Sequence, residues 1–477
     1  MKTDLAIIGA GPGGYIAALR AAQLGMRVTI VESARLGGVC LNRGCIPTKT
    51  MLRTAMAAQE VKNAGAFGIV LEGGWHVDYP VALARRDAVV ARLRNGVWGL
   101  LKHGKVQILA GRASFTGPYT LAVEPVSSDI GAGKGAALPE TATVEAGHII
   151  VATGSIPLGL RVPGAGHPRV LDSDGALALT AVPSSIVVVG AGAVGCEWSQ
   201  IFARLGARVT LVETLPAVLP DQDADSSAEI ARVLDDEGVT VKTETAMEAI
   251  AEAGSDLVVE LAPTGGGPRR TVEAEYVLVA AERAPLTDGL GLEAVGVHTD
   301  AGGWITTDEY QRTNVPSVLA VGDVTGGPLL AHVAYRQGIV AVEKLAGLSP
   351  LPVRHGRVPS VTYTDPEVAG VGLSEAQARA AGMSVLVGRF PLSANGRAAA
   401  QGVEHGLVKV VADARFGRVL GVHIVGPQAG ELLAEAVLAL ELEVTLDELV
   451  SVMRAHPSLS EAVGEAALAA QSRALHL

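Results

Sequence analysis

The strongest constraint on the fold of this 477-residue chain is that one segment of its sequence occurs twice. Residues 5–32 read LAIIGAGPGGYIAALRAAQLGMRVTIVE, and residues 186–213 read IVVVGAGAVGCEWSQIFARLGARVTLVE. Each copy has a short apolar strand, a Gly-x-Gly-x-x-Gly turn, a helical stretch and a second strand that ends in glutamate. The spacing between the two turns equals the spacing between the two glutamates. The chain therefore contains two βαβ units of the same kind.

The residues of this motif have separate physical roles. The first glycine permits a tight turn, the second lets the backbone approach a pyrophosphate, and the third lets the helix pack on the strand. The glutamate that follows can accept hydrogen bonds from ribose hydroxyls. One such pattern alone is weak evidence, but two copies with an acid at the same distance predict two dinucleotide sites. The residues are Gly9, Gly11, Gly14 and Glu32 in the first copy, and Gly190, Gly192, Gly195 and Glu213 in the second.

The second copy favours NAD over NADP. The carboxylate of Glu213 would repel a 2′-phosphate, and the following TLPAVLPD contains no arginine to bind one.

Composition excludes several other classes of protein. The net charge of −11 argues against nucleic-acid binding, which requires a basic face. The 11 histidines are scattered and do not join the cysteines at zinc-site spacing, so we expect no metal. No apolar run reaches the ~18 residues that span a bilayer. We therefore expect a soluble, cytoplasmic protein with no membrane contact.

Two of the three cysteines are placed where redox chemistry could use them. Cys40 and Cys45 lie close together in GGVCLNRGCIPTK, just after Glu32. Structural disulfides are improbable in a cytoplasmic protein of this size. A helix that begins near these residues would favour the thiolate that exchange chemistry requires, although two unrelated buried thiols are the alternative. Cys196, beside a packing glycine, is expected to be an inert core residue.

GGVCLNRGCIPTK closely resembles the redox motif of the two-cysteine flavoprotein disulfide reductases. The resemblance continues through ATGS at 152–155, through 312–338 and through two C-terminal segments at 363–375 and 420–441. It implies a Cys40–Cys45 redox disulfide, FAD in the first dinucleotide site and NAD in the second. It also implies that Thr153 and Gly154 lie at the chain crossing beside the flavin, and that Asp323 contacts the flavin's ribityl chain.

Two further elements match the family by position. The resemblance implies that Lys49 lies near the flavin N5 and pairs with Glu197, and a buried charge would need such a partner. HPSLSE at 456–461 resembles the family's His-Pro-Thr-x-x-Glu element, which makes His456 the general base and Glu461 its orienting partner. A helix capping box of Ser458 and Glu461 is the alternative, and the two roles are compatible.

In the family this histidine serves the cysteine pair of the other subunit, so the resemblance implies a homodimer. The apolar stretch 431–440 is a plausible part of its interface.

Within the family, 420–441 and HPSLSEAVGEAA most resemble the members that oxidise protein-bound dihydrolipoamide to lipoamide with reduction of NAD⁺. The implied partner is the lipoyl domain, and an E2-type core, of a 2-oxo acid dehydrogenase complex or the glycine cleavage system. A glutathione reductase-like enzyme and a non-catalytic flavoprotein subunit are the alternatives. Glu282 and Ala284 depart from the family pattern and leave the details of the NAD pocket open.

These features together predict an α/β fold with two Rossmann-like dinucleotide-binding domains and a C-terminal α+β dimerisation domain. The expected boundaries are 1–155 for the FAD-binding domain, 156–278 for the NAD-binding domain, 279–350 for a central segment that completes the FAD domain, and 351–477 for the interface domain. A low-complexity stretch at 127–140 is expected to form an extended loop.

Overall fold

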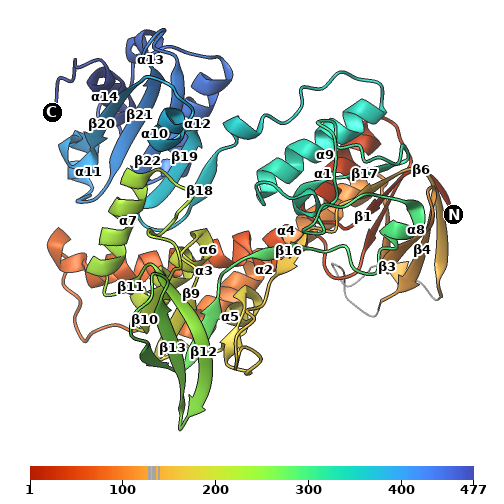
Figure 1. Ribbon diagram of the computed structural model, residues 1–477, viewed down its shortest axis with the longest axis horizontal. Coiled ribbons are helices and arrows are strands. Elements are labelled where there is room, and N and C mark those ends of the chain that lie inside the picture. Colours follow the sequence, from red (N-terminus) through yellow and green to blue (C-terminus); the bar gives the residue numbers. More distant parts are fainter. Residues whose placement is uncertain (127–129, 131–135, 138–139) are drawn as a thin grey trace. The chain divides into compact units, whose positions relative to one another are not determined.

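The structure is a computed structural model that describes residues 1–126, 130, 136–137 and 140–477 (Figure 1). Most of the predicted loop at 127–140 lies outside the described residues. The chain forms two compact units, and each contains one copy of the repeated segment. The four predicted domain boundaries stay predictions. The first unit comprises Met1–Thr50, Val81–Leu158 and Glu282–Val353, and the second comprises Met51–Pro80, Gly159–Ala281 and Arg354–Leu477.

The first unit is built on a seven-stranded sheet. Its strands are β1 (Lys2–Ile8), β2 (Val28–Glu32), β3 (Gln107–Gly117), β4 (Thr120–Pro125), β5 (Ala136–Ala137), β6 (Ala142–Val151) and β17 (Val318–Ala320). Five of them run parallel in the order β3–β2–β1–β6–β17. β4 pairs antiparallel with the C-terminal part of β3 and with the N-terminal part of β6. β5 pairs parallel with β3.

Helices cover this sheet and place its glycine turn. In Figure 1, α1 and α9 lie side by side. A Cβ on Gly338 of α9 would lie 2.7 Å from the carbonyl oxygen of Gly13, so the two helices approach closely. The other elements of this unit include α3, which ends in the second unit, and α4, which begins there. They are α1 (Pro12–Gln23), α2 (Gly38–Arg43), α3 (Cys45–Lys62), α4 (Tyr79–His103), β7 (Ser155–Pro157), β16 (Arg283–Pro285), α8 (Leu292–Val295), η2 (Gly322–Thr325) and α9 (Ala331–Leu345).

The second unit contains another parallel sheet, with the order β11–β10–β9–β15–β8. A three-stranded antiparallel sheet, β12–β13–β14, is inserted into it. The elements are η1 (Ala64–Phe67), β8 (Val170–Leu171), α5 (Ser173–Ala178), β9 (Ser185–Val189), α6 (Ala193–Arg204), β10 (Arg208–Val212), α7 (Ala224–Asp236), β11 (Thr240–Lys242), β12 (Thr245–Ala253), β13 (Asp256–Pro263), β14 (Arg270–Ala274) and β15 (Tyr276–Val279).

The C-terminal part of this unit is a five-stranded antiparallel sheet in the order β18–β19–β22–β21–β20, packed against helices α12 and α14. The predicted apolar helix at 431–440 is confirmed as part of α12. The elements are η3 (His355–Arg357), β18 (Ser360–Thr362), β19 (Glu367–Gly372), α10 (Glu375–Ala380), β20 (Val385–Pro391), η4 (Leu392–Ala394), α11 (Gly396–Ala400), β21 (Leu407–Asp413), β22 (Val419–Gly426), α12 (Ala429–Glu441), α13 (Leu446–Ser451) and α14 (Glu461–Ala470).

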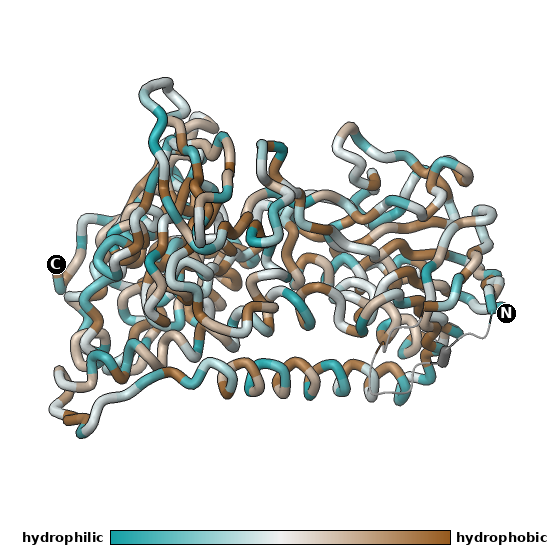
Figure 2. The backbone as a smooth tube through the Cα atoms, turned by 90° about the horizontal axis from the view of Figure 1, so that it is seen from below, coloured by the Kyte–Doolittle hydropathy of each residue, from teal (hydrophilic) through white to brown (hydrophobic). Residues whose placement is uncertain are grey.

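The internal repeat thus extends beyond the motif itself. β2, β1 and β6 of the first sheet correspond in order to β10, β9 and β15 of the second. The central strands are apolar and buried. Figure 2 shows hydrophobic and hydrophilic segments alternating along the backbone. Among the helices that the structure describes, none combines the length and the apolar character needed to cross a membrane.

Candidate active site

The first and third glycines of each turn are required by the fold of the chain. Gly9 and Gly190 have φ of +98° and +99°, a region that favours glycine. A Cβ on Gly14 would lie 1.9 Å from the carbonyl oxygen of Gly9. A Cβ on Gly195 would lie 1.8 Å from the carbonyl oxygen of Gly190. No side chain fits at these positions.

The second glycine of each turn has open space beside it. Among the described residues, a Cβ on Gly192 would meet no heavy atom within 4 Å apart from its chain neighbours, and a Cβ on Gly11 would have the Cα of Gly38 at 3.8 Å. Gly11 and Gly192 are also the N-cap residues of α1 and α6. Because a helix N-terminus favours an anion, the residues present fit a dinucleotide pyrophosphate at both turns.

The two predicted acidic residues hold the turns through the same hydrogen bonds. Glu32 Oε2 accepts the N–H of Ala10 at 2.7 Å, and Glu213 Oε2 accepts the N–H of Ala191 at 2.7 Å. The other carboxylate oxygen accepts the N–H of Ala34 in the first turn, at 2.7 Å, and the N–H of Leu215 in the second, at 2.9 Å. Burial raises the pKa of Glu32, and these N–H groups oppose that effect. The carboxylates therefore shape the turns, a role that the sequence did not predict. Their contact with ribose stays a prediction.

Substituting the second and third glycines of the second turn should affect different properties: NAD⁺ affinity for Gly192 and thermal stability for Gly195. Gly195→Ala should lower the midpoint of thermal unfolding, because it forces a Cβ against the Gly190 carbonyl and overpacking costs about 1–3 kcal/mol. Gly192→Ala should leave that midpoint unchanged but raise the Kd for NAD⁺ at least about tenfold, a change of about 1.4 kcal/mol. Calorimetric unfolding and NAD⁺ titration measure the two effects. An unchanged Kd in Gly192→Ala would contradict the assignment of this turn.

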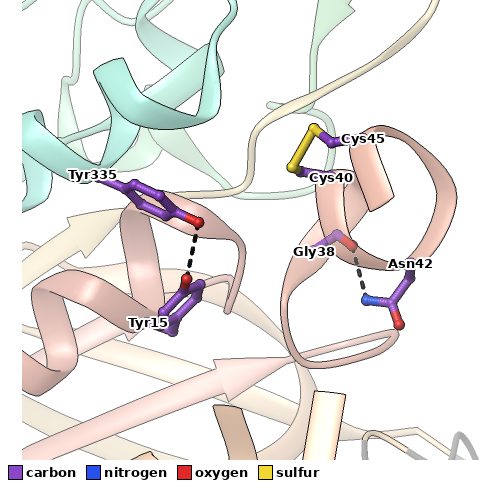
Figure 3. The surroundings of a disulfide bond; sticks show 6 residues. All are labelled: Tyr15, Gly38, Cys40, Asn42, Cys45 and Tyr335. Carbon is purple, nitrogen blue, oxygen red and sulfur yellow. Dashed lines mark hydrogen bonds between the residues drawn. A yellow bond between two sulfur atoms is a disulfide. The ribbon is translucent and has the colours of Figure 1, made fainter. Parts of the chain in front are cut away.

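Cys40 and Cys45 are joined by a disulfide bond (Figure 3). Cys40 lies in α2, and Cys45 is the first residue of the 18-residue α3. Both residues are half-buried. A thiolate on Cys45 would lie at the N-terminus of a long helix, whose dipole stabilises negative charge. The implied pairing is confirmed. Cys196 is fully buried, and burial raises the pKa of its thiol, as expected of an inert residue.

Sequence reasoning missed two groups in the surroundings of this disulfide. Asn42 donates from Nδ2 to the carbonyl oxygens of Leu36 and Gly38, both at 2.9 Å, and so fixes the entry to α2. The hydroxyls of Tyr15 and Tyr335 meet at 3.0 Å (Figure 3). Burial, with this hydrogen bond, raises the pKa of Tyr15. Asn42 lies inside the motif GGVCLNRGCIPTK, whereas nothing in the sequence connects the two tyrosines.

The chain crossing after β6 joins several of the residues predicted to face the first cofactor. Ser155 Oγ donates to Asp323 Oδ2 at 2.7 Å, and Arg283 Nε donates to Ser155 Oγ at 2.7 Å. Gly154 has a φ of +76°. The Oγ1 of Thr153 is buried and has no hydrogen-bond partner within the described part of the chain. Because a buried hydroxyl is rarely left unpaired, this atom is suited to a bound group.

Glu197 belongs to a polar stripe on α6 that binds the segment 363–365. Glu197 is 2% exposed, and its Oε1 accepts the N–H of Tyr363 at 2.9 Å. Gln200 accepts the N–H of Asp365 at 2.7 Å, and Arg204 Nη1 lies 2.7 Å from Asp365 Oδ2. These positions are three and four residues apart, so they share one helix face. The stripe fixes Glu197 through contacts that the sequence did not predict.

The predicted partner of Glu197 lies in the other unit. Lys49 is four residues after Cys45 on α3, one helical turn further along. Its pairing with Glu197 stays a prediction, as does its position near a flavin.

His456 and Glu461 form the predicted hydrogen-bonded pair. His456 Nδ1 lies 2.9 Å from Glu461 Oε1, and the histidine side chain is 80% exposed. Because an ionised carboxylate only accepts, Nδ1 donates in this hydrogen bond, and the role of His456 as a base stays a prediction. The Ser458 N–H, with His456, lowers the pKa of Glu461, which keeps this carboxylate ionised at neutral pH.

The capping-box interpretation is only partly correct. Glu461 Oε2 accepts the N–H of Ser458 at 2.8 Å, which is half of the box. However, α14 begins one residue after Ser460, which is its N-cap, and the Ser458 hydroxyl instead contacts the Ser460 hydroxyl at 2.9 Å.

Comparison with known proteins decides the family. Residues 3–338 match the model of the pyridine nucleotide-disulphide oxidoreductases, and 358–467 match the dimerisation domain of the same family. The chain belongs to the pyridine nucleotide-disulphide oxidoreductase family. It is 45% identical to a dihydrolipoyl dehydrogenase of Thermus scotoductus, a match that covers 100% of this chain and 99% of that protein. It is 42% identical to a dihydrolipoyl dehydrogenase of Halobacterium salinarum, over 99% and 97%.

Solved structures of this oxidoreductase family agree. LpdA of Mycobacterium tuberculosis is 30% identical, with a TM-score of 0.87 over 98% of this chain and 99% of that one. The flavoprotein disulfide reductase RclA of Escherichia coli is 26% identical, with a TM-score of 0.86 over 98% and 99%. The predicted fold class is confirmed, including the C-terminal dimerisation domain. Oxidoreductases of this family use FAD and NAD, which agrees with the cofactors expected from the sequence.

Proposed function

We propose that this oxidoreductase oxidises protein-bound dihydrolipoamide to lipoamide and reduces NAD⁺, using FAD and the Cys40–Cys45 disulfide. The observation that carries the proposal is this disulfide, formed shortly after β2 of the first dinucleotide-binding segment, in a chain 45% identical to a named dihydrolipoyl dehydrogenase. The intact His456–Glu461 pair supports catalysis rather than a purely structural role.

In the proposed reaction, one substrate thiol attacks the Cys40 sulfur while His456 Nε2 accepts its proton. Cys45 leaves as a thiolate, stabilised by the N-terminus of α3. The second substrate thiol then attacks the substrate sulfur of the mixed disulfide and releases Cys40. His456 returns its proton to the released Cys40, and the proton of the second substrate thiol passes to the Cys45 thiolate. The substrate becomes a disulfide and the cysteine pair becomes a dithiol, so electrons and protons balance.

Bound FAD supplies the transfer of the electron pair from the reduced cysteines to NAD⁺. We assign Gly9, Gly11, Gly14, Glu32, Thr153, Gly154 and Asp323 to FAD binding, and Gly190, Gly192, Gly195 and Glu213 to NAD binding. Lys49, whose pairing with Glu197 stays a prediction, would stabilise negative charge beside the FAD ring.

The proposed partners follow from the substrate. A lipoyl group attached to a protein domain would deliver the dithiol to the half-buried cysteines. We propose a homodimer in which the exposed His456 of one subunit serves the cysteine pair of the other. The dimerisation domain of the chain and the exposure of the His456 side chain support this arrangement.

The test is NAD⁺ reduction by the purified holoenzyme with free dihydrolipoamide, run beside NADPH oxidation with glutathione disulfide. We expect rapid formation of NADH in the first assay and negligible turnover in the second. Turnover only with NADPH and glutathione disulfide would overturn both substrate assignments. FAD binding without turnover in either assay would instead support the non-catalytic alternative.

A further inference from the structure

The turn at the second dinucleotide site is closed by the segment that follows β10. The N–H of Ala191 donates to Glu213, and its carbonyl oxygen accepts the N–H of Leu219 at 2.8 Å. Leu219 is 3% exposed and has a φ of +45°. Its carbonyl oxygen accepts from Ser227 Oγ on α7 at 3.0 Å. The backbone that faces the dinucleotide is therefore held in place by residues 213–219.

A buried ion pair lies four residues after Leu219, at Asp223. Asp223 is 2% exposed and is the N-cap residue of α7. Both of its carboxylate oxygens accept from Lys409 Nζ, at 2.9 and 3.0 Å. Lys409 lies on β21 of the C-terminal sheet, and its side chain is 3% exposed. Figure 1 shows α7 beside this sheet. Lys409 thus ties the residues before α7 to the dimerisation domain, together with the N–H of Glu375, which donates to Asp223 Oδ2 at 3.4 Å.

The same ammonium group compensates two more carboxylates. Lys409 Nζ lies 2.7 Å from Asp225 and 3.1 Å from Glu375. Although burial raises the pKa of Glu375, its hydrogen bonds to Lys409 and to two arginines hold that pKa at about 2. Arg389 also contacts Asp225 and Glu375, at 2.8 and 2.6 Å, but is 49% exposed. Removing Lys409 would leave Asp223 buried without this compensating charge, which is unfavourable.

We infer that Lys409 is a positioning residue for NAD: through Asp223 it fixes segment 213–223 and so the turn that receives the pyrophosphate. The inference rests on the proposed assignment of this turn to NAD. Lys409→Met should raise the Kd for NAD⁺ about 3- to 30-fold, the range for residues that act through packed neighbours. The KM for NAD⁺ should rise in parallel, whereas reduction of the enzyme by dihydrolipoamide without NAD⁺ should keep its parent rate.

The experiment is calorimetric titration of NAD⁺ into the oxidised holoenzyme, with parent and variants compared. Lys409→Arg should restore most of the affinity because it keeps the charge. Arg389→Gln is the matched control, since it removes a cation from the same cluster but leaves the Lys409–Asp223 pair, and it should stay within about twofold of the parent. If Lys409→Met does not fold, the Kd of Asp223→Asn for NAD⁺ tests the inference instead. Asparagine still caps α7, while the ion pair is lost.

Three results would overturn the inference. They are a parent-like Kd in Lys409→Met or Asp223→Asn, an equal loss in Arg389→Gln, and a loss of the dithiol reaction as large as the loss of NAD⁺ affinity. Failure of the parent enzyme to bind NAD⁺ at all would instead refute the proposed function.

Discussion

Replacing Cys45 with serine is expected to abolish NAD⁺ reduction by dihydrolipoamide. The Cys40–Cys45 disulfide is the proposed electron acceptor, and a serine oxygen cannot form it. The fall in kcat should reach at least about 10⁴-fold, the scale seen when one member of a set of catalytic residues that act together is removed. Steady-state formation of NADH measures it.

Cys196→Ser is the matched control, because Cys196 is a fully buried thiol outside the disulfide. Its turnover should stay close to that of the parent. A thiol count under native conditions gives a second readout. The parent should show no reactive thiol, and Cys45→Ser should show about one, the half-buried Cys40. Dithiol turnover that survives in Cys45→Ser would refute the mechanism.

Replacing His456 with glutamine is expected to lower kcat with dihydrolipoamide by about 10²- to 10⁴-fold, the usual contribution of a general base. FAD content and NAD⁺ affinity should not change, because the substitution removes only proton transfer. Glu461→Gln should cause a smaller fall, since the imidazole is kept but loses the carboxylate that orients it.

The chain offers a close control for this prediction. His476 Nδ1 lies 2.7 Å from Glu465, and the His476 side chain is 70% exposed, so it resembles the His456 pair in geometry and exposure. His476→Gln should have parent-like turnover. Equal losses in His456→Gln and His476→Gln would indicate a general effect of the C-terminal region rather than base catalysis.

The low pKa of Glu461 also predicts how the pair responds to acid. A lowered pKa means that the folded state favours the ionised carboxylate. Its stabilising contribution is therefore complete above the usual glutamate pKa of 4.5 and is lost as the pH falls through the lowered value. Thermal unfolding of the parent and Glu461→Gln should accordingly differ at neutral pH and converge in acid.

Much of the fold could be predicted because its signals are local. A glycine turn between a strand and a helix needs only a few consecutive residues, and the same turn occurs twice. The positive φ of Gly9 and Gly190, and the blocked Cβ positions of Gly14 and Gly195, then follow from the motif. The His456–Glu461 pair is equally local, since its members are five positions apart.

Other features could not be predicted because their partners are distant in sequence. Lys409 pairs with Asp223 across 186 positions, and Glu197 binds the backbone of Tyr363 across 166. In the sequence such residues resemble solvated surface charges, because the neighbouring residues do not indicate that these side chains are buried. The capping box at 458–461 formed only in part: Glu461 accepts the N–H of Ser458, but the N-cap residue of α14 is Ser460.

The sequence by itself determined the two dinucleotide turns, the redox cysteines and the histidine element, because each depends on short-range geometry encoded in residue types and spacing. Tertiary structure decided which charges are buried together and how the turns are held. Glu32 and Glu213 accept hydrogen bonds from the backbone of their own turns. Lys409, through Asp223, connects the second turn to the C-terminal sheet. The Lys409 contact forms only when segments far apart in the chain are brought together, where the cost of burying a charge makes a partner necessary.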